Sequence, residues 1–339
     1  MEPYIIDRMH RLFQQWSGKA AERFDVLPQS GSYRVYCRLE GAGLTALAAY
    51  NTDLKENEAF VSFSRSFKKA GLPVPEVYRL EESGDLYLLE DLGTQTLFDC
   101  VRSAGFDARV LSHYSDSLQA LVALQVSGKD VIDYSKCYPR AAFDRESMMW
   151  DLNYFKYYFL KLVRIPFDEQ RLEDDFRSFV TYLMQEPADY FLFRDFQTAN
   201  IMIREGKPYF IDYQGGRRGA LQYDAASLLY DAKARMPKAL RKQLTEQYIQ
   251  ALQARVDIDV HAFRNRFQGF VLIRLMQAMG AFGFRGIVEK KPGFMESIPF
   301  GLEMFADVLE DWSLPVDVPE LKACFQRMLE SQYLKEVLS

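Results

Sequence analysis

The chain has 339 residues, of which 48% are hydrophobic and 14% aromatic, so it can bury a sizeable core and is expected to form two lobes. Its 42 basic and 47 acidic residues give a net charge of −5. The sequence contains no long basic run of the kind that binds a phosphate backbone, which argues against a nucleic-acid partner.

No membrane or secretory segment is predicted. No stretch approaches the roughly 20 apolar residues that cross a bilayer, and the start lacks the basic and then apolar pattern of a secretory signal. We therefore expect no membrane contact and a cytoplasmic location. The four cysteines and three histidines are scattered, without the spacing of a zinc site or a disulfide framework.

The first part of the chain is predicted to form an antiparallel sheet with two helices. Apolar residues recur at helical spacing over 4–16 and again over 53–70. The predicted strands, separated by glycine, serine and proline turns, are 24–27, 33–39, 44–50, 77–80 and 86–90.

After Gly93 the pattern becomes mainly helical. The predicted helices lie near 96–104, 108–125, 145–162, 167–185, 237–254, 260–279, 294–311 and 319–337, and another opens near Gln222. Two glycine-containing stretches interrupt this pattern. Residues 215–219 are interpreted as a basic turn, and residues 281–286 as either a substrate-lining loop or a helix connector.

One polar motif stands out between these elements. An apolar run leads into Asp195, Asn200 follows five residues later, and a short predicted hairpin then presents Asp212 at the end of an apolar strand. In kinase-type phosphoryl transfer the protein orients a hydroxyl with a carboxylate and holds magnesium against the phosphates. The pattern predicts Asp195 as that carboxylate. It predicts Asn200 and Asp212 as magnesium ligands, because oxygen ligands suit this ion.

This stretch resembles the aminoglycoside phosphotransferase branch of the protein-kinase-like fold, whose motif is His-x-Asp-x-x-x-x-Asn followed by Ile-Asp-Phe or Ile-Asp-Trp. Within that branch the chain looks most like the bacterial cell-wall amino-sugar kinases, which phosphorylate the anomeric hydroxyl of N-acetylmuramate or N-acetylglucosamine. The second likeness also rests on residues 88–96, 151–159, 212–214 and 223–229. The resemblance implies an α+β, two-lobe fold: a small antiparallel β-sheet lobe over 1–92 and a larger, mainly helical lobe over 93–339.

The same resemblance implies ATP and Mg²⁺ as cofactors and a set of binding residues. The expected nucleotide-binding residues are Ser30, Gly31, Ser32, Arg34, Glu90 and Leu92. The first three form a loop whose backbone N–H groups would cover the phosphates. Asp224 is expected to hydrogen-bond the backbone of the catalytic loop, and Arg194 to support that loop with it.

Two departures from the family pattern stand out. Residues 45–50 lack the lysine that in the family contacts the phosphates and pairs with a glutamate of the next helix. Arg34 or Arg38 is a hypothetical substitute, and two solvated arginines are the alternative. Phe193 replaces the usual histidine. This second departure leaves open a kinase-like module that binds ligands but catalyses little.

For the acceptor we expect a small sugar or amino sugar. Candidate contacts are Gln214, Arg217, Tyr154 and Phe284. Aromatic rings stack on sugars, and an arginine near the metal site suits either a phosphate or an acidic substituent such as a lactyl carboxylate. Aminoglycosides, choline, homoserine and methylthioribose-like compounds remain alternatives, because one fold carries many acceptors. The preference for ATP over GTP and the oligomeric state also stay open.

Overall fold

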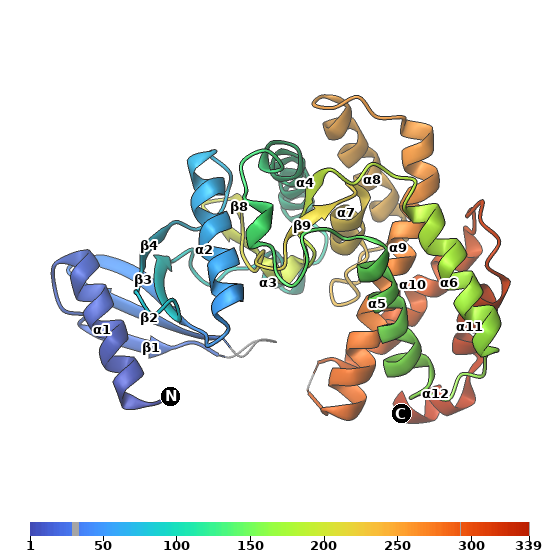
Figure 1. Ribbon diagram of the computed structural model, residues 1–339, viewed down its shortest axis with the longest axis horizontal. Helices are drawn as coiled ribbons and strands as arrows, with labels where there is room; N and C mark the ends of the chain where they lie inside the picture. The colour runs from blue at the N-terminus through green and yellow to red at the C-terminus, as the bar shows by residue number, and fades with distance from the viewer. Residues whose placement is uncertain (29–33, 292, 339) are drawn as a thin grey trace.

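The computed structural model describes residues 1–28, 34–291 and 293–338, and it has two lobes (Figure 1). The N-terminal lobe contains a five-stranded sheet in the order β1-β2-β3-β5-β4, in which every neighbouring pair is antiparallel. Its strands are β1 (Arg23–Val26), β2 (Val35–Gly41), β3 (Leu44–Tyr50), β4 (Val77–Leu80) and β5 (Leu86–Glu90). The predicted antiparallel sheet is confirmed.

The two faces of this sheet are buried by different partners. The helices of the lobe are α1 (Pro3–Ser17) and α2 (Leu54–Lys69). Because successive side chains of a strand point to opposite faces, Leu88 belongs to a core with Met9 and Phe13 of α1. Its neighbour Tyr87 instead stacks on Phe60 of α2, with ring centroids 5.4 Å apart. Phe60 also stacks on Tyr213, at 5.0 Å. The sheet thus lies between α1 and the rest of the molecule.

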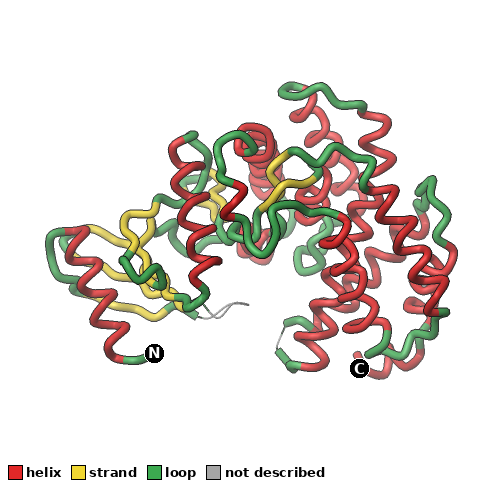
Figure 2. Tube along the Cα trace, viewed as in Figure 1, coloured by secondary structure: helices red, strands yellow, loops and turns green. Residues whose placement is uncertain are grey.

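The C-terminal lobe is mainly helical, as predicted, and Figure 2 shows strands only in the N-terminal lobe and in the middle of the molecule. The helices are α3 (Leu97–Ala104), α4 (Ala108–Gly128), α5 (Arg145–Phe155), α6 (Glu169–Leu183), α7 (Gln222–Leu229), α8 (Lys238–Gln253), α9 (Val260–Phe282), α10 (Ile298–Glu310), α11 (Pro319–Glu330) and α12 (Gln332–Leu338). Two short antiparallel pairs complete the lobe. They are β6 (Tyr190–Leu192) with β9 (Arg217–Gly219), and β7 (Ile201–Arg204) with β8 (Lys207–Phe210).

Helix α9 is the central helix of this lobe and contacts α5, α7 and α10. The segment Val260–Val288 is long and apolar enough to cross a membrane by length and composition, which corrects the expectation that no stretch of the chain is. In the most apolar part of this segment, 61% lies buried inside the protein. A helix that is apolar all round is typical of a protein core, and the packing of α9 between three helices agrees with that role.

Three segments differ from their predictions. Residues 281–286 form neither a loop nor a connector, because α9 continues directly into the π-helical segment Gly283–Val288. Residues 215–219 include β9, whose partner β6 is too far away in the sequence for local turn signals to reveal. The predicted helix 319–337 is divided at Ser331, which has an extended backbone, into α11 and α12.

Candidate active site

The loop after β6 carries Asp195, and a buried carboxylate holds its backbone. The carboxylate of Asp224, in α7, accepts hydrogen bonds from the backbone N–H groups of Phe193 at 2.7 Å and Arg194 at 3.0 Å. Gln125 of α4 donates a third, at 3.2 Å. This is the contact that the family resemblance implied for Asp224. Asp195 itself keeps 48% of its side chain exposed, so that a substrate hydroxyl can reach it.

Arg194 has an unusual backbone conformation, with φ at 87°. Non-glycine residues seldom adopt positive φ, and they do so where surrounding contacts hold them. Here the guanidinium forms a bidentate ion pair with Asp151 of α5, at 2.8 and 2.6 Å, and donates to the Tyr223 hydroxyl at 2.7 Å. Arg194 therefore ties the loop to α5 and α7.

Phe193, in the place of the family histidine, is fully buried in a cluster of aromatic rings. Its ring meets those of Phe196, Phe210 and Tyr213 edge to face, with centroids 5.2–6.2 Å apart. Such edge-to-face pairs contribute beyond the area that they bury. Aromatic packing of Phe193 thus holds the loop in place, where a histidine would hold it by hydrogen bonding.

Asn200 and Asp212 lie beside the same loop. The amide nitrogen of Asn200 donates to the Asp195 carbonyl at 2.9 Å and lies 3.4 Å from Asp212 Oδ2. The amide oxygen of Asn200 therefore remains as an acceptor. Burial of the Asp212 carboxylate, together with the nearby charge of Asp195, raises the pKa of Asp212. A divalent cation would offset this clustering of negative charge, and the oxygen donors of Asn200 and Asp212 fit Mg²⁺.

A chain of polar contacts connects this pair to the N-terminal lobe. Gln214 donates to Asp212 Oδ1 at 2.8 Å and lies 3.4 Å from Glu56 Oε1 of α2. Glu56 in turn pairs with Arg34, whose Nη2 lies 3.1 Å from Glu56 Oε2. Arg34 is 2% exposed, so it is not the solvated arginine that the sequence left as an alternative. Gln214 thus lies between Asp212 and Glu56.

Arg38 and Glu90 have structural partners near the connection between the lobes. Arg38 binds Asp91 through two nitrogens, at 2.6 and 3.0 Å, so its charge is already paired. The Glu90 carboxylate bridges Lys68 at 2.9 Å and Arg204 at 2.8 Å. The Glu90 N–H donates to the Glu76 carbonyl at 2.8 Å, so both the carboxylate and the N–H of Glu90 already have partners.

The other predicted binding residues fall into three groups. Leu92 is buried, at 4% exposure. Tyr154 and Phe284 both lie next to the ring of Tyr158, at centroid distances of 5.1 and 5.0 Å, and so form one aromatic cluster of α5 and the end of α9. Ser30, Gly31 and Ser32 lie outside the described residues.

Several residues that sequence reasoning missed also lie at the site. Asp231 accepts hydrogen bonds from the Thr198 hydroxyl at 2.6 Å and from its N–H at 3.2 Å, which fixes the loop before Asn200. Arg274 of α9 places Nη2 3.8 Å from Asp195 Oδ1. A single arginine within the apolar run 270–276 was a signal that could have identified Arg274, because a buried charge requires a specific partner.

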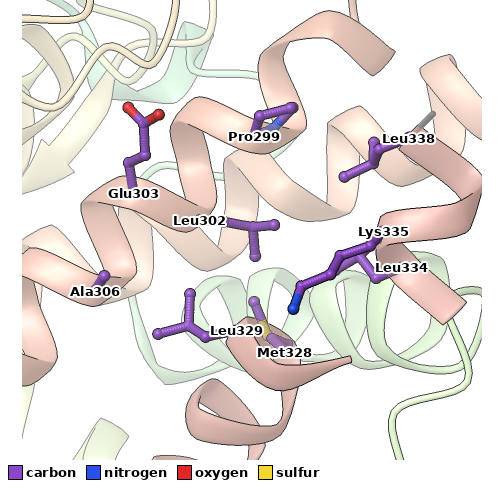
Figure 3. A pocket seen from close by; sticks show the side chains of 9 residues that line it. All are labelled: Pro299, Leu302, Glu303, Ala306, Met328, Leu329, Leu334, Lys335 and Leu338. Carbon is purple, nitrogen blue, oxygen red and sulfur yellow. The ribbon is translucent and has the colours of Figure 1, made fainter. Parts of the chain in front are cut away.

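A separate apolar hollow of about 450 Å³ lies between α10, α11 and α12 (Figure 3). Its lining includes Leu302, Met328 and Leu338. None of the motif residues lines this hollow, and its lining offers no carboxylate pair for phosphoryl transfer.

Comparisons with known proteins identify the family and the fold of this chain. The sequence profile of the phosphotransferase enzyme family matches residues 28–263. An N-acetylmuramate/N-acetylglucosamine kinase of Pseudomonas putida is 23% identical over 308 residues, which cover 87% of each chain.

Two solved structures share the fold. A choline kinase from Cryptosporidium parvum Iowa II superposes with a TM-score of 0.62 at 11% identity, covering 95% of this chain and 99% of that one. An amicoumacin kinase in complex with AMP-PNP and Ca²⁺ superposes with a TM-score of 0.59 at 11% identity, covering 95% and 97%. The neighbours confirm the α+β, kinase-like two-lobe fold. The chain belongs to the phosphotransferase enzyme family, and it is an enzyme that transfers a phosphoryl group to an alcohol group of a small molecule.

Proposed function

We propose that this enzyme is an ATP- and Mg²⁺-dependent kinase that phosphorylates the anomeric hydroxyl of an amino sugar, N-acetylmuramate or N-acetylglucosamine. The observation that carries the proposal is the clamped loop that holds the exposed Asp195 beside the Asn200 and Asp212 oxygens. The P. putida relative, which is covered over 87% of its length, supports the choice of acceptor. Such a reaction belongs to cell-wall recycling in the cytoplasm.

In the proposed reaction Asp195 accepts a hydrogen bond from the anomeric hydroxyl and takes its proton as the oxygen attacks the terminal phosphorus. A new oxygen–phosphorus bond forms, the bond to the bridging oxygen breaks, and ADP leaves. Asn200 and Asp212 would hold Mg²⁺, which neutralises charge on the phosphates when it is bound. The backbone clamp by Asp224 keeps the Asp195 carboxylate in position for the attack.

For the nucleotide we propose that Arg34 supplies the cation that residues 45–50 lack. It is buried and paired with Glu56 of α2, which is the arrangement that the family builds with a lysine. The Ser30-Gly31-Ser32 loop would cover the phosphates. The base would lie against Leu92 and the backbone carbonyl of Glu90, because bases in such connections are held by backbone groups and apolar neighbours.

Kinases of other small alcohols remain the second class, but a cationic antibiotic is not favoured. The acidic side chains of α6, which might attract such a substrate, are used structurally. Glu169 and Glu173 both pair with the buried Lys156, the former at 2.8 Å, and Asp175 accepts from the Leu321 N–H at 2.8 Å. The acidic cluster is therefore already compensated by groups of the protein.

The test is the formation of ADP from Mg-ATP with a panel of acceptors: N-acetylmuramate, N-acetylglucosamine, glucose, choline and kanamycin. We expect turnover of an amino sugar to an ester that mild acid hydrolyses, as befits an anomeric phosphate. Asp195→Asn should reduce kcat by about 100-fold or more while ATP still raises the melting temperature. Turnover of choline or kanamycin in preference to both amino sugars would refute the proposed acceptor.

A further inference from the structure

Two buried guanidinium groups lie on the C-terminal-lobe side of Asp195. Arg274 of α9 is 4% exposed, and Arg217 of β9 is 6% exposed. Arg274 reaches within 3.8 Å of Asp195 Oδ1, so any hydroxyl that binds Asp195 brings its molecule next to this guanidinium. Arg217 of β9 pairs with Leu192 of β6, and Leu192 precedes Asp195 by three residues.

The hydrogen bonds of both groups go to neutral oxygens. Arg274 donates Nε to the Ser227 hydroxyl at 2.9 Å and Nη1 to the Gln277 amide oxygen at 2.6 Å. Arg217 donates Nε to the Gly215 carbonyl at 2.9 Å. Among the residues that the structure describes, no carboxylate lies within hydrogen-bond distance of either guanidinium. Both therefore differ from Arg194, which is fully paired with Asp151.

Buried charges are costly unless an opposite charge compensates them. Burial and the neighbouring charge of Arg194 lower the pKa of Arg217, and the carboxylates of Asp151 and Asp195 offset this effect only in part. Arg274 has a long ion pair with Asp195, at 3.8 Å, in place of a hydrogen-bonded one. An anionic ligand would therefore add to the partial compensation that the protein gives these two cations. A guanidinium fork matches a carboxylate through two parallel hydrogen bonds, so a carboxylate on the acceptor would fit.

We propose that Arg274 and Arg217 form an anion site that selects an acceptor carrying a carboxylate, such as the lactyl group of N-acetylmuramate, over the neutral N-acetylglucosamine. This inference rests on the proposed function, whose acceptor it narrows. Arg274 is the specificity-determining residue nearest the reacting hydroxyl, and Arg217 is the second. The terminal phosphate of ATP is the other anion that approaches Asp195, and the experiment separates the two.

The experiment compares kcat/KM for N-acetylmuramate and N-acetylglucosamine, which differ only in the lactyl ether. The wild type should prefer N-acetylmuramate, and Arg274→Gln and Arg217→Gln should each reduce the ratio of the two kcat/KM values roughly tenfold to a hundredfold. Arg274→Lys should retain part of the ratio, because it keeps the charge. Arg218→Gln is the matched control: Arg218 is the exposed neighbour on β9 and stacks on the Tyr134 ring at 3.9 Å, so its ratio should not change.

Equal losses for both sugars in the Gln variants, or a wild type that does not distinguish them, would overturn the anion site and leave the kinase proposal intact. Failure to phosphorylate either sugar would instead refute the proposed function. In that case the anion site is tested by the melting temperature. N-acetylmuramate should raise the melting temperature of the wild type but not that of Arg274→Gln, and an equal rise in the two proteins would overturn the anion site.

Discussion

Three buried carboxylates hold the polypeptide around Asp195 and Asn200, and each of them binds groups of the protein. Asp151 binds the Arg194 side chain, Asp224 binds the backbone N–H groups of Phe193 and Arg194, and Asp231 binds Thr198. Two residues of the site have positive φ, Arg194 at 87° and Asp212 at 70°. Residues in such conformations cost free energy that the neighbouring contacts must offset, so these carboxylates are expected to matter for catalysis without taking part in it.

The first prediction concerns Asp224 and pH. Burial raises the pKa of the Asp224 carboxyl to about 7, well above the value of about 4 for an unfolded aspartate. Between these two values the folded state binds more protons than the unfolded state, so this group's contribution to stability falls as the pH rises from about 4 to about 7 and is constant above. In Asp224→Asn this dependence should be absent.

Urea unfolding of both proteins at about pH 5, 6, 7 and 8 measures this effect. The free energy of unfolding of the wild type minus that of the variant should decrease from pH 5 to about pH 7 and then level off. The variant should also lose about tenfold or more in kcat, because the two N–H donors bind different oxygens of Asp224 and the NH2 group of Asn would face one of them. Parallel pH curves for the two proteins would contradict the assignment.

The second prediction concerns Arg34. Its removal takes away a buried cation that we place at the phosphates, so Arg34→Ala should raise the KM for ATP about tenfold or more and leave the KM for the acceptor nearly unchanged. Glu56→Gln should have a smaller effect in the same direction. Arg79→Ala is the control, because Arg79 is an exposed arginine of β4. An unchanged KM for ATP in Arg34→Ala would exclude this role.

Among the helices that the structure describes, α5 and α9 make the most extensive contact with each other. Each continues into a π-helical segment, Lys156–Leu160 after α5 and Gly283–Val288 after α9. The two segments approach so closely that a Cβ atom at Gly283 would lie 1.8 Å from the Tyr158 carbonyl oxygen. π-Helical segments often occur at functional sites, and here they bring the aromatic rings of Tyr158 and Phe284 into contact.

The third prediction tests this close approach. Gly283→Ala should force the two backbones apart, since the obstructing atom belongs to the main chain and cannot rotate away, and it should destabilise the protein by about 1–3 kcal/mol. Chemical denaturation monitored by circular dichroism measures the loss. Ala281→Ser, a half-buried position two residues earlier, adds an atom without this obstruction and should stay near the wild type. A wild-type midpoint for Gly283→Ala would show that the segments separate easily.

At the scale of the whole molecule, the two lobes share one hydrophobic core. Phe60 of α2 stacks on Tyr213 at 5.0 Å, and Phe67 meets Phe191 at 5.0 Å. The Tyr213 hydroxyl also lies 2.6 Å from the Ser64 hydroxyl.

We propose that the lobe boundary lies between residues 92 and 93. Hydrogen exchange at 91–94 should then change when Mg-ATP binds, and unchanged protection there would count against a hinge.

The fourth prediction follows from the shared core: the lobes should unfold together. Trp16, which stacks on Tyr78 at 4.4 Å, reports on the N-terminal lobe, whereas Trp150 and Trp312 report on the C-terminal lobe. Fluorescence of a Trp150→Phe, Trp312→Phe variant should therefore give the same urea midpoint as that of Trp16→Phe, after correction for the stability of each variant. Two separated midpoints would show that the lobes unfold independently.

The sequence by itself determined most elements and the order of the site residues. Strands β4 and β5 have their predicted bounds, and α2 and α3 lie within one residue of theirs, because both periodicity and turn residues act over a few neighbouring positions. The motif from Asp195 to Asp212 was recognisable for the same reason: its residues lie close together along the chain. Asp224 was identified only through the family resemblance, since its partners Phe193 and Arg194 are about 30 residues earlier.

Only the tertiary structure decided which arginines belong to the site. Arg34 and Arg38 occupy equivalent positions in the sequence pattern, yet Arg34 pairs with Glu56 and Arg38 with Asp91. Arg274 reaches Asp195 from a helix almost 80 residues away, and its neighbours in the sequence are core residues. Local patterns record how a side chain fits its own helix or strand. The charge that a side chain meets across the fold depends on packing between distant elements, which those patterns do not contain.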